Sequence, residues 1–232
     1  MLADAKSDLP FGIRVAVDDF DAFGLRCGEP VHVRAGFVGI ASRLVVDCRA
    51  AVRWVPDVSY PHAPGLIERL EVVAESVRGK SWSGSPEMAR AVMSAVQAPA
   101  TLRTVLAKII GCGPGATPSG DDVIVGILAV LGSPLAGAAQ RRKAGLLRRA
   151  VLPLLPTTTD LSAHLLRQAA HGLPGRDLHD LVSALIGNSS PSHLRDAVRR
   201  VIGTGATSGA DTCEGLLVFA PSYFIQPHEI AA

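Results

Sequence analysis

Two short stretches of the chain hold residue types that could do chemistry, and both follow one residue order. Residues 111–122 read Gly-Cys-Gly-Pro-Gly-Ala-Thr-Pro-Ser-Gly-Asp-Asp, and residues 205–211 read Gly-Ala-Thr-Ser-Gly-Ala-Asp, repeating the order of residues 115–121. Glycines let backbone N–H groups approach a ligand closely, and the N–H groups of a helix start attract anions. Either stretch alone is explained as a helix-starting turn, but the pair predicts two neighbouring loops that share one site.

A third polar stretch, residues 157–162, also combines hydroxyls with a carboxylate ahead of a helix. If the three helix starts converge, they form a cradle for a small anion, or for an amide or carbamoyl group that needs both donors and acceptors. The predicted ligand-binding residues are Gly113, Gly115, Thr117, Ser119, Gly120, Thr158, Thr159, Ser162, Thr207, Ser208 and Gly209. The candidate catalytic residues are Asp121, Asp122 and Asp211, whose carboxylates can cap a helix, orient an attacking N–H or bind a cation.

Several common catalytic and cofactor motifs are missing from the sequence. Two aspartates follow Ser119-Gly120 where a nucleotide-binding P-loop has lysine, and a helix-like segment precedes the first loop where a dinucleotide fingerprint needs a strand. No Gly-x-Ser-x-Gly elbow, Cys-x-x-Cys pair or His-x-x-x-His pair occurs. No metal or cofactor is therefore predicted, and Cys112 and Cys213 are interpreted as small buried residues.

Composition and charge point to an ordinary water-soluble chain. The net charge of +2 gives no reason to expect nucleic acid or an anionic membrane as a partner. No run of 18 apolar residues is free of charges or helix breakers, and residues 1–10 lack the apolar segment of a signal peptide. We therefore expect a reduced, cytoplasmic protein.

The elements that must position the loops change in character near residue 60. Short β-branched runs at residues 15–17, 31–33, 37–40, 44–47 and 52–55 predict a small antiparallel sheet or partly open barrel. After residue 65 the apolar residues recur at three and four, which indicates helices. The predicted fold class is α+β, with a β-rich domain of residues 1–60 and a helical domain of residues 61–232 that carries the loops.

Helix boundaries follow from prolines, glycines and capping residues. Ser85-Pro86 predicts a helix start with Ser85 as cap, Pro99 predicts a break, and residues 123–131 predict a central helix buried on all sides. The other expected helices are 66–77, 102–110, one from Ser133-Pro134 to Pro153, one through His171, 176–186, and one from Ser190-Pro191 to Ile202. Residues 226–232 are expected to fray.

Three motifs in this order, Gly113-Pro-Gly-Ala-Thr-Pro-Ser-Gly-Asp-Asp122, Thr158-Thr-Asp-Leu-Ser162 and Gly205-Ala-Thr-Ser-Gly-Ala-Asp211, resemble the AllH-like family. That family includes a subunit of oxamate carbamoyltransferase, an enzyme of anaerobic allantoin and purine nitrogen use. The resemblance covers roughly residues 102–220. The family typically has a histidine where this chain has Ala206.

The resemblance implies carbamoyl transfer between carbamoyl phosphate and an amide nitrogen of a small carboxylate, with other carbamoyltransferase subunits or further copies of the chain as partners. The glycine loop would hold phosphate or the carbamoyl oxygen, while Asp121 or Asp122 orients the N–H. The alternative is a non-catalytic subunit that binds a small anion or helps assembly. The lack of Lys and Arg in all three loops favours this alternative for the isolated chain.

Overall fold

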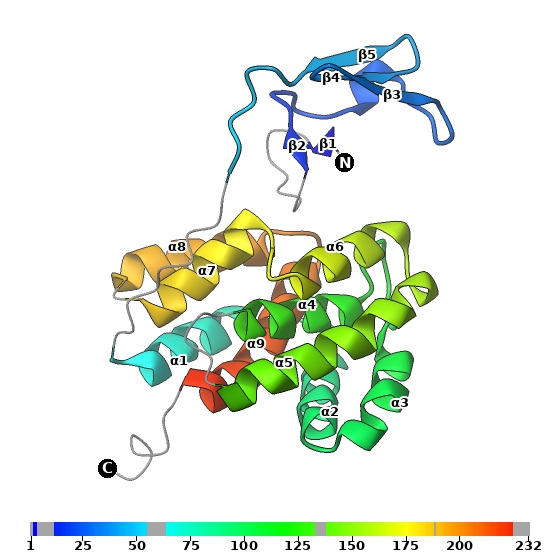
Figure 1. Ribbon diagram of the computed structural model, residues 1–232. Coiled ribbons are helices and arrows are strands. Elements are labelled where there is room, and N and C mark those ends of the chain that lie inside the picture. Colours follow the sequence, from blue (N-terminus) through cyan, green and yellow to red (C-terminus); the bar gives the residue numbers. More distant parts are fainter. Residues whose placement is uncertain (1, 4–11, 55–63, 133–137, 188, 225–232) are drawn as a thin grey trace. The chain divides into compact units, whose positions relative to one another are not determined.

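The computed structural model describes residues 2–3, 12–54, 64–132, 138–187 and 189–224 (Figure 1). The chain divides into two compact units, the N-terminal unit Met1–Pro56 and the helical unit Asp57–Ala232. The predicted helix start at Ser133-Pro134 and the predicted frayed tail lie outside the described residues. No described helix is both long and apolar enough to cross a membrane.

The N-terminal unit contains a three-stranded antiparallel sheet in the order β3-β4-β5. Its strands are β3 (Val31–Arg34), β4 (Phe37–Ile40) and β5 (Leu44–Asp47). Because successive strand residues point to opposite faces, Val38 and Val46 are paired on one face and buried together in the small core of this unit. The predicted antiparallel sheet is confirmed, and in the described residues it is an open sheet instead of a barrel.

Two of the predicted strands in this unit are wrong. Residues 15–17 form no strand; β2 (Ile13–Arg14) precedes them and pairs in parallel with β1 (Leu2–Ala3). Residues 52–54 are also outside any strand, and a single 3₁₀ turn, η1 (Asp21–Phe23), lies between β2 and β3. A short β-branched run becomes a strand only where a partner strand is placed beside it, and local composition does not report the partner.

The helical unit is built from α-helices connected by short loops. The helices are α1 (Leu66–Val77), α2 (Ser85–Gln97), α3 (Pro99–Ile109), α4 (Ser119–Leu131), α5 (Ala138–Val151), α6 (Asp160–Ala170), α7 (Arg176–Ile186), α8 (Pro191–Ile202) and α9 (Ser208–Phe224), with a 3₁₀ segment η2 (Leu152–Thr157) before α6. The predicted fold class, α+β and mostly helical, is confirmed.

Several helix ends follow the expected chemistry. Pro99 separates α2 from α3, as expected from its missing N–H group. The Ser190 hydroxyl caps α8 by accepting from the His193 N–H at 3.2 Å. The predicted cap Ser85 is wrong: it is the first residue of α2, Gly84 stands at the cap position, and the Ser85 hydroxyl bonds elsewhere.

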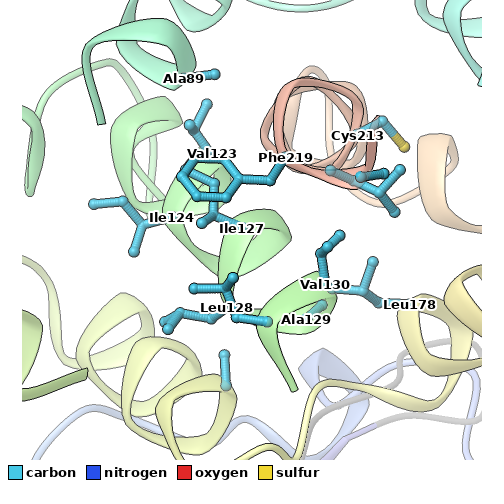
Figure 2. Close-up of a cluster of buried hydrophobic side chains, with 14 of the residues drawn as sticks. Ala89, Val123, Ile124, Ile127, Leu128, Ala129, Val130, Leu178, Cys213 and Phe219 are labelled. Carbon is cyan, nitrogen blue, oxygen red and sulfur yellow. The ribbon is translucent and has the colours of Figure 1, made fainter. Parts of the chain in front are cut away.

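Helix α4 is the centre of the helical unit, as predicted. Every α4 residue except Val125 is buried, and α9 packs along it more extensively than any other pair of described elements. Figure 2 shows Phe219 of α9 reaching toward Val123 and Ile127 of α4. All three side chains are 0–1% exposed, and burial of aromatic and branched side chains such as these contributes about 1.5–3 kcal/mol each.

The contact between α4 and α9 depends on a reciprocal pair of glycines. A Cβ on Gly126 of α4 would lie 1.9 Å from the carbonyl oxygen of Thr212, and a Cβ on Gly215 of α9 would lie 2.0 Å from that of Val123. Each glycine is the eighth residue of its helix. The two backbones therefore touch directly, and each helix meets the other in the same way.

The same repeat extends to the helix starts. A Cβ on Gly120, the second residue of α4, would lie 2.1 Å from the carbonyl oxygen of Ile109 in α3. A Cβ on Gly209, the second residue of α9, would lie 1.8 Å from that of Val201 in α8. The start of α4 thus approaches the end of α3 through a glycine, as the start of α9 approaches α8.

Candidate functional site

The starts of α4, α6 and α9 meet at the first loop, residues 110–118. The hydroxyl oxygens of Thr117 and Ser208 lie 2.7 Å apart and share a hydrogen bond, which joins the first loop to α9. The Thr159 hydroxyl donates to the carbonyl oxygen of Ala116 at 2.6 Å, which joins the same loop to α6. The prediction that the two similar loops are neighbours is confirmed, and the start of α6 joins them.

Asp121 ties the first loop to the α6 start. One of its oxygens, Oδ1, accepts from the Gly111 N–H at 2.9 Å, and the other accepts from the Thr158 hydroxyl. Burial raises the pKa of Asp121, while hydrogen bonds from the Thr158 hydroxyl and the Gly111 N–H oppose the rise. The expected role as a cap of α4 is not seen, because α4 has Pro118 at its cap position and no side-chain cap bond.

Asp211 holds the turn that precedes α2. Its Oδ1 accepts from the Trp82 N–H and from the Ser85 hydroxyl, each at 2.7 Å. The neighbouring bond from the Ser81 hydroxyl to Glu214 at 2.9 Å strengthens the same connection. Sequence reasoning missed these partners, because 126 positions separate Ser85 from Asp211 and no local pattern signals the contact.

Asp122 is a buried carboxyl group that is mostly protonated at neutral pH. Burial raises its pKa to about 8; the Ser208 and Thr117 hydroxyls oppose the rise, and the negative charges of Asp211 and Asp121 add to it. Its Oδ2 atom has no hydrogen-bond partner. At pH 7 this side chain is therefore chiefly a neutral acid that can donate a hydrogen bond.

The backbone hydrogen bonds at the starts of α4 and α9 correct the correspondence between the two loops. The carbonyl oxygen of Pro118 accepts from the Asp122 N–H at 3.2 Å, and that of Thr207 accepts from the Asp211 N–H at 2.8 Å. Asp211 is therefore equivalent to Asp122, whereas the order of residues had matched it with Asp121. The second loop, from Gly205 to Asp211, is one residue shorter than the first, from Gly115 to Asp122. The match between the two loops therefore shifts by one position.

Many of the N–H groups at these helix starts are already bonded within the chain. The Gly120 N–H donates to the carbonyl oxygen of Cys112 at 2.8 Å, and the Asp121 N–H donates to that of Pro118 at 2.9 Å. The other bonds of this kind run from Gly209 N–H to Thr204 O, from Ser162 N–H to Thr159 Oγ1 and from Ala163 N–H to Thr159 O. A ligand at this place would consequently meet side chains more than backbone donors.

The glycines of the first loop have backbone roles. Gly113 and Gly115 have φ angles of 115° and 92°, a region that side chains disfavour. A Cβ on Gly113 would lie 2.7 Å from the Ser119 nitrogen, whereas a Cβ on Gly115 would meet nothing within 4 Å. Gly113 lets the loop pass directly over the start of α4, and Gly115 supplies only the turn.

Four buried oxygen atoms in this region have no hydrogen-bond partner: Ser119 Oγ, Asp122 Oδ2, Ser162 Oγ and Asp211 Oδ2. Orphaned buried polar groups are costly and are commonly matched by water or a ligand. Among the described residues, the three carboxylates form no ion pair, and no cluster of three His, Cys, Asp or Glu could hold a metal. The arrangement therefore suits a partner that brings both hydrogen-bond donors and acceptors.

The buried cysteine beside the second loop, Cys213, lacks the setting of a nucleophile. Cys213 in α9 is 0% exposed, and burial raises its pKa to about 12. Its thiol is protonated at neutral pH, and only a thiolate is reactive. Cys112 in the first loop is half-buried and unpaired. The interpretation of Cys213 as a small buried residue is confirmed.

Replacing Ser85 by alanine should destabilise the helical unit by about 1.5–3 kcal/mol, the contribution of a hydrogen bond to a charged group. The change removes one of the two donors to Asp211 Oδ1. Urea denaturation measures the loss. The matched control is Ser76→Ala, which removes a hydroxyl bonded only to the carbonyl of Val72 in its own helix and should cost less than about 1 kcal/mol. Equal effects of the two changes would contradict the role of Ser85.

The part of the chain that forms the three helix starts is similar to a known protein family. No solved structure matches the chain. A family model matches residues 109–220, which run from the last residue of α3 through the three helix starts to α9 and leave the N-terminal unit outside. That family is described as Oxamate carbamoyltransferase subunit AllH, so the resemblance indicated by the three motifs is confirmed over residues 109–220.

Proposed function

We propose that the chain is a subunit of an oxamate carbamoyltransferase-type enzyme and binds a small carboxylate or carbamoyl ligand at the starts of α4, α6 and α9. The observation that carries the proposal is that the three motifs within the family match are the three that meet at the first loop. The reaction would serve allantoin and purine nitrogen use, with the other subunits of the enzyme as partners.

Carbamoyl transfer would depend on how the two substrates are positioned more than on a covalent bond to the protein. The amide nitrogen of the acceptor attacks the carbamoyl carbon, the bond from that carbon to the phosphate oxygen breaks, and the nitrogen loses a proton as phosphate leaves. Asp121 already accepts two hydrogen bonds, whereas Asp122 has an unpartnered Oδ2. Asp122 is therefore the better placed of the two to contact the ligand, and its neutral state lowers the negative charge that an anion meets.

The direct test combines the full chain with the other subunits of an oxamate carbamoyltransferase. Oxamate-dependent release of phosphate from carbamoyl phosphate is measured with and without this chain. We expect release only from the complete mixture. A mixture that keeps its full rate without the chain would contradict the proposal.

The second candidate function is a subunit that supports assembly without touching the reacting atoms. It is favoured because Asp121, Asp122 and Asp211 form no ion pair with any described residue. The hydrogen bonds of Asp121 and Asp211 also hold neighbouring turns together, which is a structural role. The two functions differ in one measurement. If Asp122→Asn leaves the rate of the complete enzyme unchanged while omission of the chain abolishes it, the chain acts in assembly.

Ser119→Ala should weaken binding of the ligand about tenfold or more, because one hydrogen bond to an ionised group contributes about 1.5–3 kcal/mol and 1.4 kcal/mol corresponds to tenfold. Ser119 is 0% exposed and its hydroxyl has no partner in the chain. The same change should leave stability equal or slightly higher, since an unsatisfied hydroxyl is removed. Calorimetric titration with oxamate and with carbamoyl phosphate measures the affinity.

Ser183→Ala is the matched control for this prediction, because its hydroxyl bonds to the carbonyl of His179 within α7. It should leave the affinity unchanged. If Ser119→Ala also binds as the wild type does, and is less stable, the hydroxyl is structural.

A further inference from the structure

Two hydroxyl groups and one carboxyl group meet where the first loop touches α9. The hydroxyl oxygens of Thr117 and Ser208 lie 2.7 Å apart, and both side chains are only partly buried. Asp122 of α4 is 5% exposed. Hydrogen bonds from Ser208 and from Thr117 both lower the pKa of Asp122 against the effect of burial, so its carboxyl group contacts both hydroxyls. We call these three side chains the Asp122 triad.

When Asp122 is neutral, the triad holds one transferable proton for each of its three links. A neutral carboxyl group and a hydroxyl group each donate one proton and also accept hydrogen bonds. Of the two hydroxyls, that of Ser208 has the larger effect on the pKa of Asp122. A proton of the buried carboxyl group therefore has a path through Ser208 to Thr117, at the partly exposed end of the triad.

The second oxygen of Asp122 distinguishes this carboxyl group from its neighbour in the sequence. Asp121 accepts a hydrogen bond at each of its two oxygens, as expected for an acid that holds a loop in place. Asp122 Oδ2 is buried and has no partner. Buried polar atoms without a partner are rare in folded proteins and commonly mark water or a ligand. Asp122 is thus not fully used in holding the fold together.

We propose that the Asp122 triad is a proton relay, in which Thr117 exchanges a proton with the ligand and Ser208 connects Thr117 to Asp122. The inference rests on the proposed function and adds the route of the proton during carbamoyl transfer. As the bond from the carbamoyl carbon to the phosphate oxygen breaks, Thr117 gives its proton to that oxygen. Ser208 then resupplies Thr117, and Asp122 resupplies Ser208.

The relay returns to its starting state within one reaction. Once the new bond from nitrogen to the carbamoyl carbon has formed, the nitrogen carries one proton too many. It gives this proton to Thr117, Thr117 passes one to Ser208, and Ser208 passes one to Asp122. The net result is one proton moved from the nitrogen to phosphate, with all three side chains unchanged.

The relay would give the site an acid that its loops otherwise lack. Residues 111–122, 157–162 and 205–211 contain no Lys, Arg or His. A hydroxyl group alone is too weak an acid to supply protons at neutral pH, whereas an acid whose pKa lies near the working pH is most effective. Burial brings the pKa of Asp122 to about 8, which meets this condition.

The test measures oxamate-dependent release of phosphate by the complete enzyme with variants of this chain. Thr117→Val keeps the size of the side chain, removes its hydroxyl, and should slow transfer about 100-fold or more. Thr117→Ser restores a hydroxyl and should recover most of the rate. The matched control, Thr101→Val, removes a hydroxyl that bonds to the carbonyl of Ala98 and should have no effect.

The pH profile separates a relay from a structural hydroxyl. The wild-type rate should fall above about pH 8, where Asp122 loses its proton. The residual rate of Thr117→Val should show no such fall, because the proton of Asp122 no longer reaches the ligand. A slow Thr117→Val enzyme that keeps this fall would overturn the relay and leave Thr117 with a structural role.

The isolated full chain tests the triad itself. Because the Ser208 hydroxyl holds the pKa of Asp122 down, Ser208→Ala should raise this pKa further. The loss of stability with rising pH ends near the folded pKa, so it should extend to a higher pH in this variant. Thr101→Val should keep the wild-type end point. Urea denaturation over a range of pH measures it, and an unchanged end point in Ser208→Ala would overturn the triad.

The outcomes separate this inference from the proposed function. A wild-type enzyme that fails to transfer at all overturns the proposed function, and the relay with it. Normal transfer with Thr117→Val, or equally slow transfer with Thr117→Ser and Thr117→Val, overturns the relay alone. Slow transfer with Thr117→Val, recovery with Thr117→Ser and unchanged assembly support both.

Discussion

Gly126→Ala should destabilise the protein by about 3 kcal/mol or more. The added Cβ would lie 1.9 Å from the carbonyl oxygen of Thr212, a backbone atom that cannot move away without shifting α9. Overpacking of this kind typically costs about 1–3 kcal/mol, and it exceeds that range when backbones are forced apart. The loss outweighs the roughly 1 kcal/mol by which alanine favours a helix over glycine. Chemical denaturation followed by circular dichroism measures it.

The matched control is Gly145→Ala in α5. Only the end of the Arg149 side chain lies within 4 Å of that position, at 3.5 Å, so the same chemical change meets flexible atoms. We expect Gly145→Ala to be neutral or to stabilise by up to about 1 kcal/mol. Equal losses from both alanines would show that helix propensity, and not the close contact of α4 with α9, determines the result.

The reciprocal glycine gives a sharper form of this prediction. Gly215→Ala alone should cost about as much as Gly126→Ala, because its Cβ would lie 2.0 Å from the carbonyl oxygen of Val123. Once one methyl group has separated the helices, the second meets less resistance. The double variant should therefore lose less stability than the sum of the two single variants, as expected for residues that share one contact. Strict additivity would contradict a single shared interface.

Much of the helical unit could be predicted because its signals are local. The bounds of α1 and α7 were predicted to the residue. Pro99 predicted the break between α2 and α3, and the uniformly apolar run after Asp122 predicted a buried central helix. The repeated residue order was enough to predict that the two loops meet. These features depend on residues that lie within a few turns of one another.

The details of the site could not be predicted because they depend on distant contacts. The partner of Ser85 is Asp211, so a side chain that fits a helix cap is used instead to hold α9. The correspondence of Asp211 with Asp122 became visible only when the carbonyl groups of Pro118 and Thr207 were seen to accept from their N–H groups. The burial that keeps Asp122 neutral arises from packing, which no spacing rule reports.

Asp122 should make the stability of the protein fall as the pH rises from about 4 to about 8. Its pKa is about 8 in the folded state against a model value of 3.8, so in this window the folded protein holds a proton that the unfolded chain has released. A group with a raised folded pKa contributes its full stability below the unfolded pKa and loses it as the pH passes the folded pKa. Asp121, whose pKa is also raised, adds to the same trend.

Asp122→Asn tests this prediction because the amide cannot ionise. The variant should match the wild type near pH 4 and exceed it above pH 8 by several kcal/mol, on the order of 1.4 kcal/mol for each pKa unit of the shift. The charges that reach Asp122 are those of Asp211 and Asp121, so the gain should not depend on any cation. Urea denaturation at pH 4 to 9 gives both curves.

The matched control is Asp196→Asn, since the Asp196 side chain is 54% exposed and pairs only with Arg199 in the same helix. Exposed pairs of this kind contribute about 0–1 kcal/mol, so this variant should keep the wild-type dependence on pH. If Asp122→Asn also keeps that dependence, then Asp122 is ionised in the folded protein. In that case the neutral acid assigned to the site would be replaced by a second negative charge beside Asp211, and an anionic ligand would have no place there.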